Sequence, residues 1–198
     1  MTLQNAYAKL KIEKKRRILL TKELKKLDLE SIKAGIHAFD GRQVVGDNGF
    51  KLIDVAVQNE YGNSWTMPRN VRFFKNGKWW NIKKGTLINI PATRFVTRII
   101  HGDERRMLIE NLKSELHILI RYGQNGLYYS ARDVIRNVGK YMVSRIRAGI
   151  DQKMFLPNAP MTIAIKGFDK RLFEKGTLYN SIKFRSKKAK VEGWLILF

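Results

Sequence analysis

The chain of 198 residues is long enough to bury a hydrophobic core, and 44% of its residues are hydrophobic, which excludes a wholly disordered polycation. It contains no cysteine, so disulfides, thiolate catalysis and cysteine-ligated zinc are excluded. Its formal net charge of +22 predicts an anionic partner, with DNA or RNA first, an acidic protein surface second and anionic lipid a distant third. The competing interpretation is a basic surface that is merely solvated.

Membrane insertion and secretion are not expected. The apolar run WLIL near the C-terminus is far shorter than the about 20 residues that span a bilayer. The N-terminal residues lack an apolar stretch followed by a cleavage site. We therefore expect a protein of the cytoplasm or of a virion, without a membrane partner.

Residues 1–30 are predicted to form a basic N-terminal helix or arm. Apolar residues recur at helical spacing in two sets, namely Leu3, Tyr7 and Leu10, then Leu20, Leu24 and Leu27. Between them lies the block KLKIEKKRR, which would project charge on most sides of a helix. An arm or mobile helix that orders against a partner is therefore favoured over a long exposed helix. The candidate interface residues of this block are Lys14, Lys15, Arg16 and Arg17.

Residues 31–198 are predicted to form a single α+β domain. Alternating apolar residues at Ile32–Ala38 predict a strand, and the glycines and polar residues of Gly41–Gly49 predict a loop. One face of the short helix that follows would carry Leu52, Val55, Ala56 and Asn59. Gly62 stands where a helix takes a left-handed C-terminal cap, so Glu60–Tyr61 are expected in the last helical turn.

Residues 63–90 are predicted to be an aromatic and basic hairpin insertion. In VRFFKNGKWWNI, Val71–Ile82, the Asn76-Gly77 pair between two aromatic runs is typical of a type I′ turn. Alternate residues of a strand face opposite sides, so the aromatic residues cannot all lie on one face. Cross-strand packing is the favoured interpretation, and a base-stacking platform is the other. The candidate interface residues are Phe73, Phe74, Trp79 and Trp80.

Long helices are predicted for the middle of the chain. Two apolar stripes recur at helical spacing, namely Leu108, Leu112, Leu116 and Leu119, then Val134, Val138, Met142, Ile146 and Ile150. Tyr122–Gly126 interrupts the pattern, which predicts a helical hairpin or a sharply kinked pair. Pro157 and Pro160 are expected to end this region.

The C-terminal region is predicted to contribute two strands, Tyr179–Arg185 and Val191–Phe198. A basic turn at Arg185–Lys190 would join them, and it contains the candidate interface residues Lys187 and Lys188. Together the elements predict an α+β fold in which an antiparallel sheet packs against long helices, with a protruding aromatic β-hairpin.

No motif of known chemistry is present. None of the three histidines stands in a metal-binding pair, and the sequence has no phosphate-binding glycine loop and no serine nucleophile motif. We therefore predict no enzyme activity, no cofactor and no metal site. A magnesium-dependent nuclease is the open alternative, because Glu60, Asp151 or Asp169 could gather in space.

Three short blocks occur in order along the chain: VAVQNEYGN at Val55–Asn63, IPATRFV at Ile90–Val96, and NAPMTIAIKGFDKRLFEKGTLYNSIKFR at Asn158–Arg185. With a long helical stretch between the second and third, they resemble the neck and tail-completion proteins of tailed bacteriophages, including the virion morphogenesis proteins of the phage Mu type. That family shows Asn-Glu-Phe/Tyr-Gly, then Ile-Pro-Ala-Arg-Pro-Phe, then Asn-Ser-Pro-x-Thr and Thr-Gly-x-Leu-x-x-Ser-Ile.

The matching residues are Asn59, Glu60, Tyr61, Gly62, Ile90, Pro91, Ala92, Phe95, Asn158, Pro160, Thr162, Lys166, Gly167, Gly176, Leu178, Ser181 and Ile182. The chain departs from the pattern at Thr93-Arg94, at Arg171-Leu172 and at Glu174–Gly176. The resemblance runs from Ile32 to the C-terminus and implies no active site.

The same blocks have physical interpretations that fix a fold. Glu60 is expected to be a structural carboxylate at a helix end, bound to backbone or to an arginine. Asn158 and Thr162 are suited to cap a short helix at Met161–Ile165. Gly176 is expected to turn the chain into a strand at Leu178–Phe184.

The resemblance implies a structural virion protein that assembles as a homo-oligomeric ring at the head–tail junction and completes the tail or connector. Its expected partners are neighbouring connector and tail proteins, with non-specific contact to genomic DNA in the lumen, and it would stay in the host cytoplasm until assembly. The alternative is a stand-alone basic nucleic-acid-binding protein that uses charge and aromatic stacking.

Overall fold

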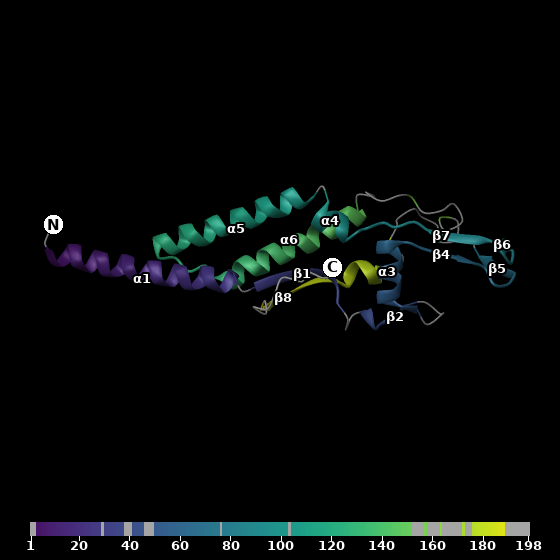
Figure 1. Cartoon of the computed structure of the whole chain (residues 1–198), viewed down its shortest axis with the longest axis horizontal. Coiled ribbons are helices and arrows are strands. Elements are labelled where there is room, and N and C mark those ends of the chain that lie inside the picture. The colour runs from purple at the N-terminus through teal and green to yellow at the C-terminus, as the bar shows by residue number, and fades with distance from the viewer. Residues whose placement is uncertain are drawn as a thin grey trace. The chain divides into compact units, whose positions relative to one another are not determined.

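The computed structural model describes residues 3–28, 30–37, 41–45, 50–75, 77–102, 104–151, 157, 163, 172 and 176–188. The helices are α1 (Leu3–Asp28), α3 (Leu52–Tyr61), α4 (Thr97–His101), α5 (Arg105–Asn125), α6 (Ala131–Asp151) and α8 (Thr177–Asn180) (Figure 1). The strands are β1 (Glu30–Ile36), β2 (Val44–Val45), β3 (Phe50–Lys51), β4 (Asn63–Thr66), β5 (Val71–Lys75), β6 (Lys78–Ile82), β7 (Leu87–Ile90) and β8 (Ile182–Lys188).

The fold is mixed α+β, as predicted, but the single antiparallel sheet that we expected is wrong for the described strands. They pair only in twos, as β1–β8, β2–β3, β4–β7 and β5–β6. Packing divides the chain into two compact units, residues 1–34, 105–142 and 184–198 in the first and residues 35–104 and 143–183 in the second. The predicted domain boundary after residue 30 stays a prediction.

The first unit contains α1, α5 and the beginning of α6. Its basic N-terminal segment is one continuous helix. The apolar stripes are separated as predicted, but the break lies later than the predicted Tyr122–Gly126, because α5 continues to Asn125 and α6 begins at Ala131. The α6 stripe is buried at all five predicted positions, Val134, Val138, Met142, Ile146 and Ile150. The α5 stripe is weaker, because only Leu119 is fully buried and Leu112 is exposed.

Gly139 lies in the middle of α6 because a strand residue packs directly on it. A Cβ added there would lie 2.2 Å from the Cδ2 atom of Phe184 on β8. Alanine normally stabilises a helix interior by about 1 kcal/mol relative to glycine. This glycine therefore serves close packing of α6 on β8.

We expect Gly139→Ala to lower the free energy of unfolding by about 2 kcal/mol, because overpacking against the aromatic ring outweighs the gain in helix propensity. Gly123→Ala on α5 is the matched control, since the three atoms nearest to the added Cβ would all belong to the flexible side chain of Leu20, the closest at 3.1 Å. Urea denaturation followed by circular dichroism measures both. A stabilised Gly139→Ala variant would contradict this packing.

The second unit contains α3, α4, α8 and residues 63–90, which we call the ribbon. The helix Leu52–Tyr61 confirms the prediction for this segment, with Leu52 and Ala56 buried. The region Gly41–Gly49, predicted as a loop, contains the two-residue strand β2, which pairs with β3. Such short ladders carry too little side-chain alternation to be recognised from sequence.

The ribbon is formed by two antiparallel ladders in succession. β4 pairs with β7 from Asn63↔Ile90 to Thr66↔Leu87, and β5 pairs with β6 from Val71↔Ile82 to Lys75↔Lys78. The second register leaves two residues in the loop, as the Asn-Gly pair predicted, and Gly77 has φ of 73°. Between the ladders, Met67 N donates to Thr86 O at 3.0 Å and Lys84 N donates to the Asn70 side chain at 2.6 Å.

The C-terminal prediction is wrong in two places. Tyr179 belongs to the short helix α8, and β8 begins only at Ile182 and continues through Lys188. Lys187 and Lys188 therefore lie in a strand that pairs with β1, and Ser31 donates to Lys187 O at 3.2 Å. Gly176 (φ 74°, ψ 0°) leads into a helix instead of a strand.

Several predictions fall outside the described residues. These are the roles of Asn158, Pro160, Thr162, Lys166 and Gly167, most of the helix at Met161–Ile165, the end of the basic turn, and the strand Val191–Phe198.

Candidate functional site

Two of the three sequence blocks meet at the base of the ribbon. Thr93 N donates to Asn59 O at 2.7 Å, and Arg94 N donates to Glu60 O at 3.2 Å. The Thr93 hydroxyl donates to the same Asn59 carbonyl. Thr93 and Phe95 are buried, with exposed fractions of 6% and 1%. The end of α3 is thus joined to the segment that leads into α4, and we call this arrangement the junction.

Glu60 occupies the centre of the junction. Its carboxylate accepts hydrogen bonds from Val96 N and Thr97 N, both at 2.9 Å, and from the Thr97 hydroxyl. These N–H groups lie at the start of α4 and have no partner within the helix, so the carboxylate acts as its N-terminal cap. The Glu60 side chain is 7% exposed. The geometry is that of a structural carboxylate bound to backbone.

Gly62 allows the chain to turn from α3 into β4. Its φ of 79° is positive as predicted, but its ψ of 166° differs from the left-handed cap that we expected. A Cβ there would lie 2.9 Å from Ala92 N and 3.0 Å from Ile90 O. The residue is therefore required both for its backbone conformation and for the close approach of the two blocks.

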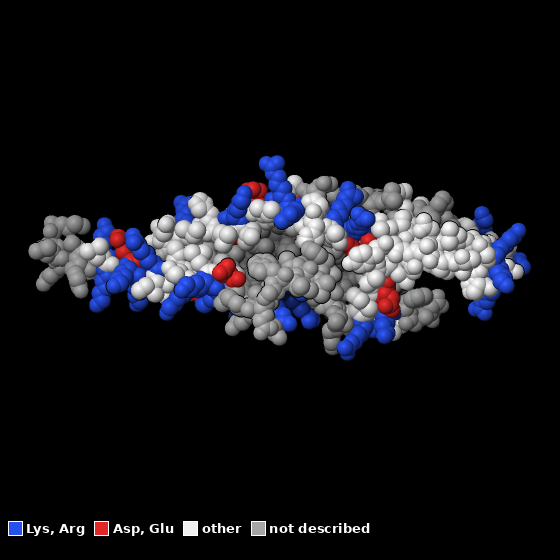
Figure 2. Space-filling model, viewed as in Figure 1, with Lys and Arg blue, Asp and Glu red and all other residues white. Residues whose placement is uncertain are grey.

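The ribbon beyond the junction is exposed. Among the described residues from 61 to 90, none is buried. On one face Phe74 and Trp79 are 57% and 54% exposed, with ring centroids 5.3 Å apart, and the Arg72 guanidinium lies 4.4 Å from the Trp79 ring. Phe73 and Trp80 pair on the opposite face and are partly exposed. Figure 2 shows Lys and Arg side chains above and below the ribbon tip, at the right of the view.

The basic residues of α1 are not equivalent. Lys14, Lys15 and Arg17 are exposed, but Arg16 is half-buried and donates to Gln124 O at 3.3 Å at the end of α5. Glu23 anchors the same helix by accepting a hydrogen bond from Ala131 N at 2.8 Å. Three of the four candidate residues of α1 therefore carry exposed charge, as predicted. The fourth, Arg16, contacts the end of α5 instead.

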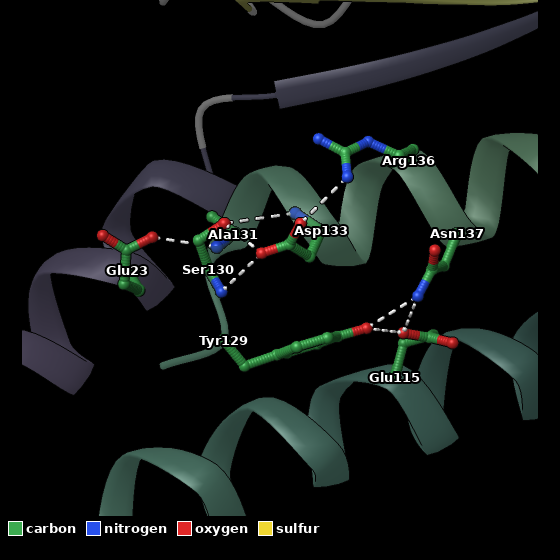
Figure 3. A network of polar contacts seen from close by, with 8 residues as sticks. All are labelled: Glu23, Glu115, Tyr129, Ser130, Ala131, Asp133, Arg136 and Asn137. Carbon is green, nitrogen blue, oxygen red and sulfur yellow. Dashed lines mark hydrogen bonds and ion pairs between the residues drawn. The ribbon is translucent and has the colours of Figure 1, made fainter. Parts of the chain in front are cut away.

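A polar network joins α1, α5 and α6 (Figure 3). Ser130 caps α6 and exchanges hydrogen bonds with Asp133, whose pKa is lowered by the Ser130 hydroxyl and N–H. The Tyr129 hydroxyl donates to the Glu115 carboxylate, which also accepts from the Asn137 amide at 3.1 Å. Burial and then the bond to Glu115 raise the pKa of Tyr129 to about 12. Every member holds the helical hairpin together, so the network is structural.

We expect the stability of the protein to fall in strong alkali through Tyr129. An unfolded tyrosine ionises near pH 10, whereas in the folded protein the pKa of Tyr129 is about 12. The folded state therefore holds the proton that the unfolded state loses, and its stabilising effect disappears as the pH rises through this window. Tyr129→Phe should flatten the dependence of unfolding free energy on pH in this range, measured against the wild type. An unchanged slope would contradict the assignment.

Sequence reasoning missed an exposed patch at the α5–α6 turn. Leu127 and Tyr128 are 56% and 89% exposed, and Tyr122 beside them is 39% exposed. An aromatic side chain that lies almost wholly in solvent is a candidate contact residue. The break predicted at Tyr122–Gly126 stopped short of Leu127 and Tyr128, and no pattern in the sequence marked these two residues.

The described residues contain no group of three or more His, Asp or Glu side chains arranged to hold a metal ion. None of the helices in this part of the chain has the length and apolar character that crossing a bilayer requires. Comparison with protein-family models, with curated proteins and with solved structures finds no match.

Proposed function

We propose that the chain is a structural protein of the tailed-phage neck, which forms a ring at the head–tail junction and completes the tail or connector. The observation that carries this proposal is the junction: two blocks that resemble the neck family, separated by the 26 residues between Asn63 and Ile90, are joined by hydrogen bonds. A structural protein that makes contacts through an exposed ribbon needs a rigid junction at the base of that ribbon.

The role of the ribbon in this proposal is to lock onto neighbouring subunits or rings. A protruding aromatic hairpin supplies large rigid contact residues, and Trp79 and Phe74 are already exposed and paired. The exposed charge of α1 would face either an acidic ring surface or DNA in the lumen. The proposed protein is not an enzyme. The hydrogen bonds of Glu60 support this, because both of its carboxylate oxygens already accept from N–H groups at the start of α4.

One departure from the family pattern has a physical consequence. The family places proline where this chain has Arg94, but Arg94 N donates to Glu60 O and the residue has φ of 52°. Proline has no N–H and is fixed near φ of about −65°. The junction here is therefore built differently from one with proline at this position.

Virions assembled without this protein test the proposal. Electron micrographs are expected to show DNA-filled heads without tails beside loose tails, and supplying the protein should restore joined particles. Whole and infectious particles formed in its absence would overturn the proposal.

The alternative is a stand-alone nucleic-acid-binding protein, favoured by the exposed aromatic and basic ribbon. Light scattering and particle imaging separate the two, since a ring predicts a high-order mass and the alternative predicts a monomer or dimer. A strict monomer at high concentration would favour the alternative.

A further inference from the structure

The ribbon has an unusual charge composition. Between Tyr61 and Gly102 the sequence has no aspartate or glutamate, although the chain contains 17 of them. The cationic residues of the ribbon are Arg69, Arg72, Lys75, Lys78, Lys83 and Lys84. This segment therefore has no acidic residue of its own to neutralise it, and it favours an anionic partner.

Both faces of the ribbon tip carry a cation stacked on a tryptophan. The register places Arg72 and Trp79 on one face and Lys78 and Trp80 on the other. Arg72 lies 4.4 Å from the Trp79 ring centre, and Lys78 Nζ lies 5.1 Å from that of Trp80. Arg72 and Lys78 are nevertheless exposed, so their charges face solvent on both sides.

A second copy of the chain is a poor anionic partner. Of its 17 acidic residues, at least seven already accept hydrogen bonds in the part of the chain that the structure describes, namely Glu23, Glu60, Glu104, Glu110, Glu115, Asp133 and Asp151. The remaining carboxylates are outnumbered several-fold by the 39 lysines and arginines. A partner with a higher density of negative charge is required.

We propose that the ribbon tip binds double-stranded DNA by lying in its major groove. The major groove is about 12 Å wide and admits a two-stranded β-ribbon. A groove has a phosphate backbone along each wall, so a ribbon that enters it edge-on turns one face to each backbone, which matches cations on both faces, whereas an acidic protein surface would meet only one. Trp79 and Phe74 lie on the same face as Arg72, so in this orientation they would pack against the sugars beside that backbone. This inference goes beyond the neck assignment: it gives the ribbon tip to DNA in place of the contact with neighbouring subunits or rings proposed above, and it holds whether or not the chain is a neck protein.

Binding of the full chain to a fluorescent B-form DNA duplex, measured by anisotropy at several salt concentrations, tests the inference. The variant R72Q/K78Q is expected to bind on the order of tenfold more weakly near 0.1 M salt. Its slope of log affinity against log salt should be smaller by about 2, because each lost phosphate contact removes about 0.9. The matched control R132Q/K140Q removes two exposed charges from α6 and should change the affinity less than about twofold.

Two further arms separate groove binding from charge alone. An RNA duplex has a deep and narrow major groove, so R72Q/K78Q should hardly change its binding. Polyglutamate, as an acidic polypeptide, should compete poorly with the DNA duplex. The inference is overturned if the wild type does not bind DNA, if the ribbon variant and the control weaken binding equally, or if RNA binding falls as much as DNA binding. Circular dichroism melting establishes that each variant is folded. Virion assembly is not a readout here, so failure of the neck proposal would leave this result intact.

Discussion

Replacing Gly62 with alanine is expected to lower the free energy of unfolding by about 3 kcal/mol. Two effects add. The backbone at φ 79° and ψ 166° belongs to a region that residues with a Cβ almost never adopt. The new Cβ would also lie 2.9 Å from Ala92 N and 3.0 Å from Ile90 O. Both neighbours are backbone atoms, which cannot swing aside as a flexible side chain can.

Gly85→Ala is the control for a positive φ without close neighbours. Gly85 also has a positive φ, 85°, but an added Cβ there would meet no atom within 4 Å. We expect it to cost about 1 kcal/mol. Urea denaturation gives both values, and hydrogen exchange at the amides of Arg94 and Thr97 should show that Gly62→Ala opens the junction. Equal costs for the two variants would mean that the close approach at Gly62 can relax.

The parts of the fold that the sequence predicts well are those fixed by local patterns. The Asn76-Gly77 pair fixes a two-residue loop, and with it the pairing of Phe73 with Trp80. The stripe Val134–Ile150 repeats at helical spacing over five positions, and all of them are buried in α6. In each case the information lies within one or two elements, where spacing alone determines which side chains share a face.

The parts that could not be predicted depend on contacts between distant residues. Glu60 was expected to bind backbone or an arginine, but nothing in the sequence indicates that its partners stand 36 and 37 positions later. From the sequence alone, Gly139 is expected only to lower the helix propensity of its segment, and its packing against Phe184 is not predictable. The helix at Tyr179 could not be predicted either, because Thr177–Asn180 is a single turn and is too short to show helical periodicity in the sequence.

Replacing Glu60 with alanine is expected to lower the free energy of unfolding by about 3 kcal/mol. The change removes the acceptor of two N–H groups and one hydroxyl at the start of α4, in a site where the carboxylate is 7% exposed. At a surface, water could accept hydrogen bonds from the N–H groups that lose the carboxylate. At this buried site, water has little access to them. Glu60→Gln should cost about 1–2 kcal/mol, because one oxygen remains and the amide group faces a donor.

Glu110→Ala is the matched control, since Glu110 is an exposed carboxylate that pairs only with Lys113 one turn away, and its loss should cost less than about 0.5 kcal/mol. The sign of the Glu60 result separates the two interpretations of this residue. A catalytic carboxylate in a cleft commonly destabilises the folded state, so its removal leaves the free energy of unfolding unchanged or raises it. A carboxylate that caps a helix has the opposite effect. A stable Glu60→Ala variant would therefore remove the structural role and restore the case for chemistry at this position.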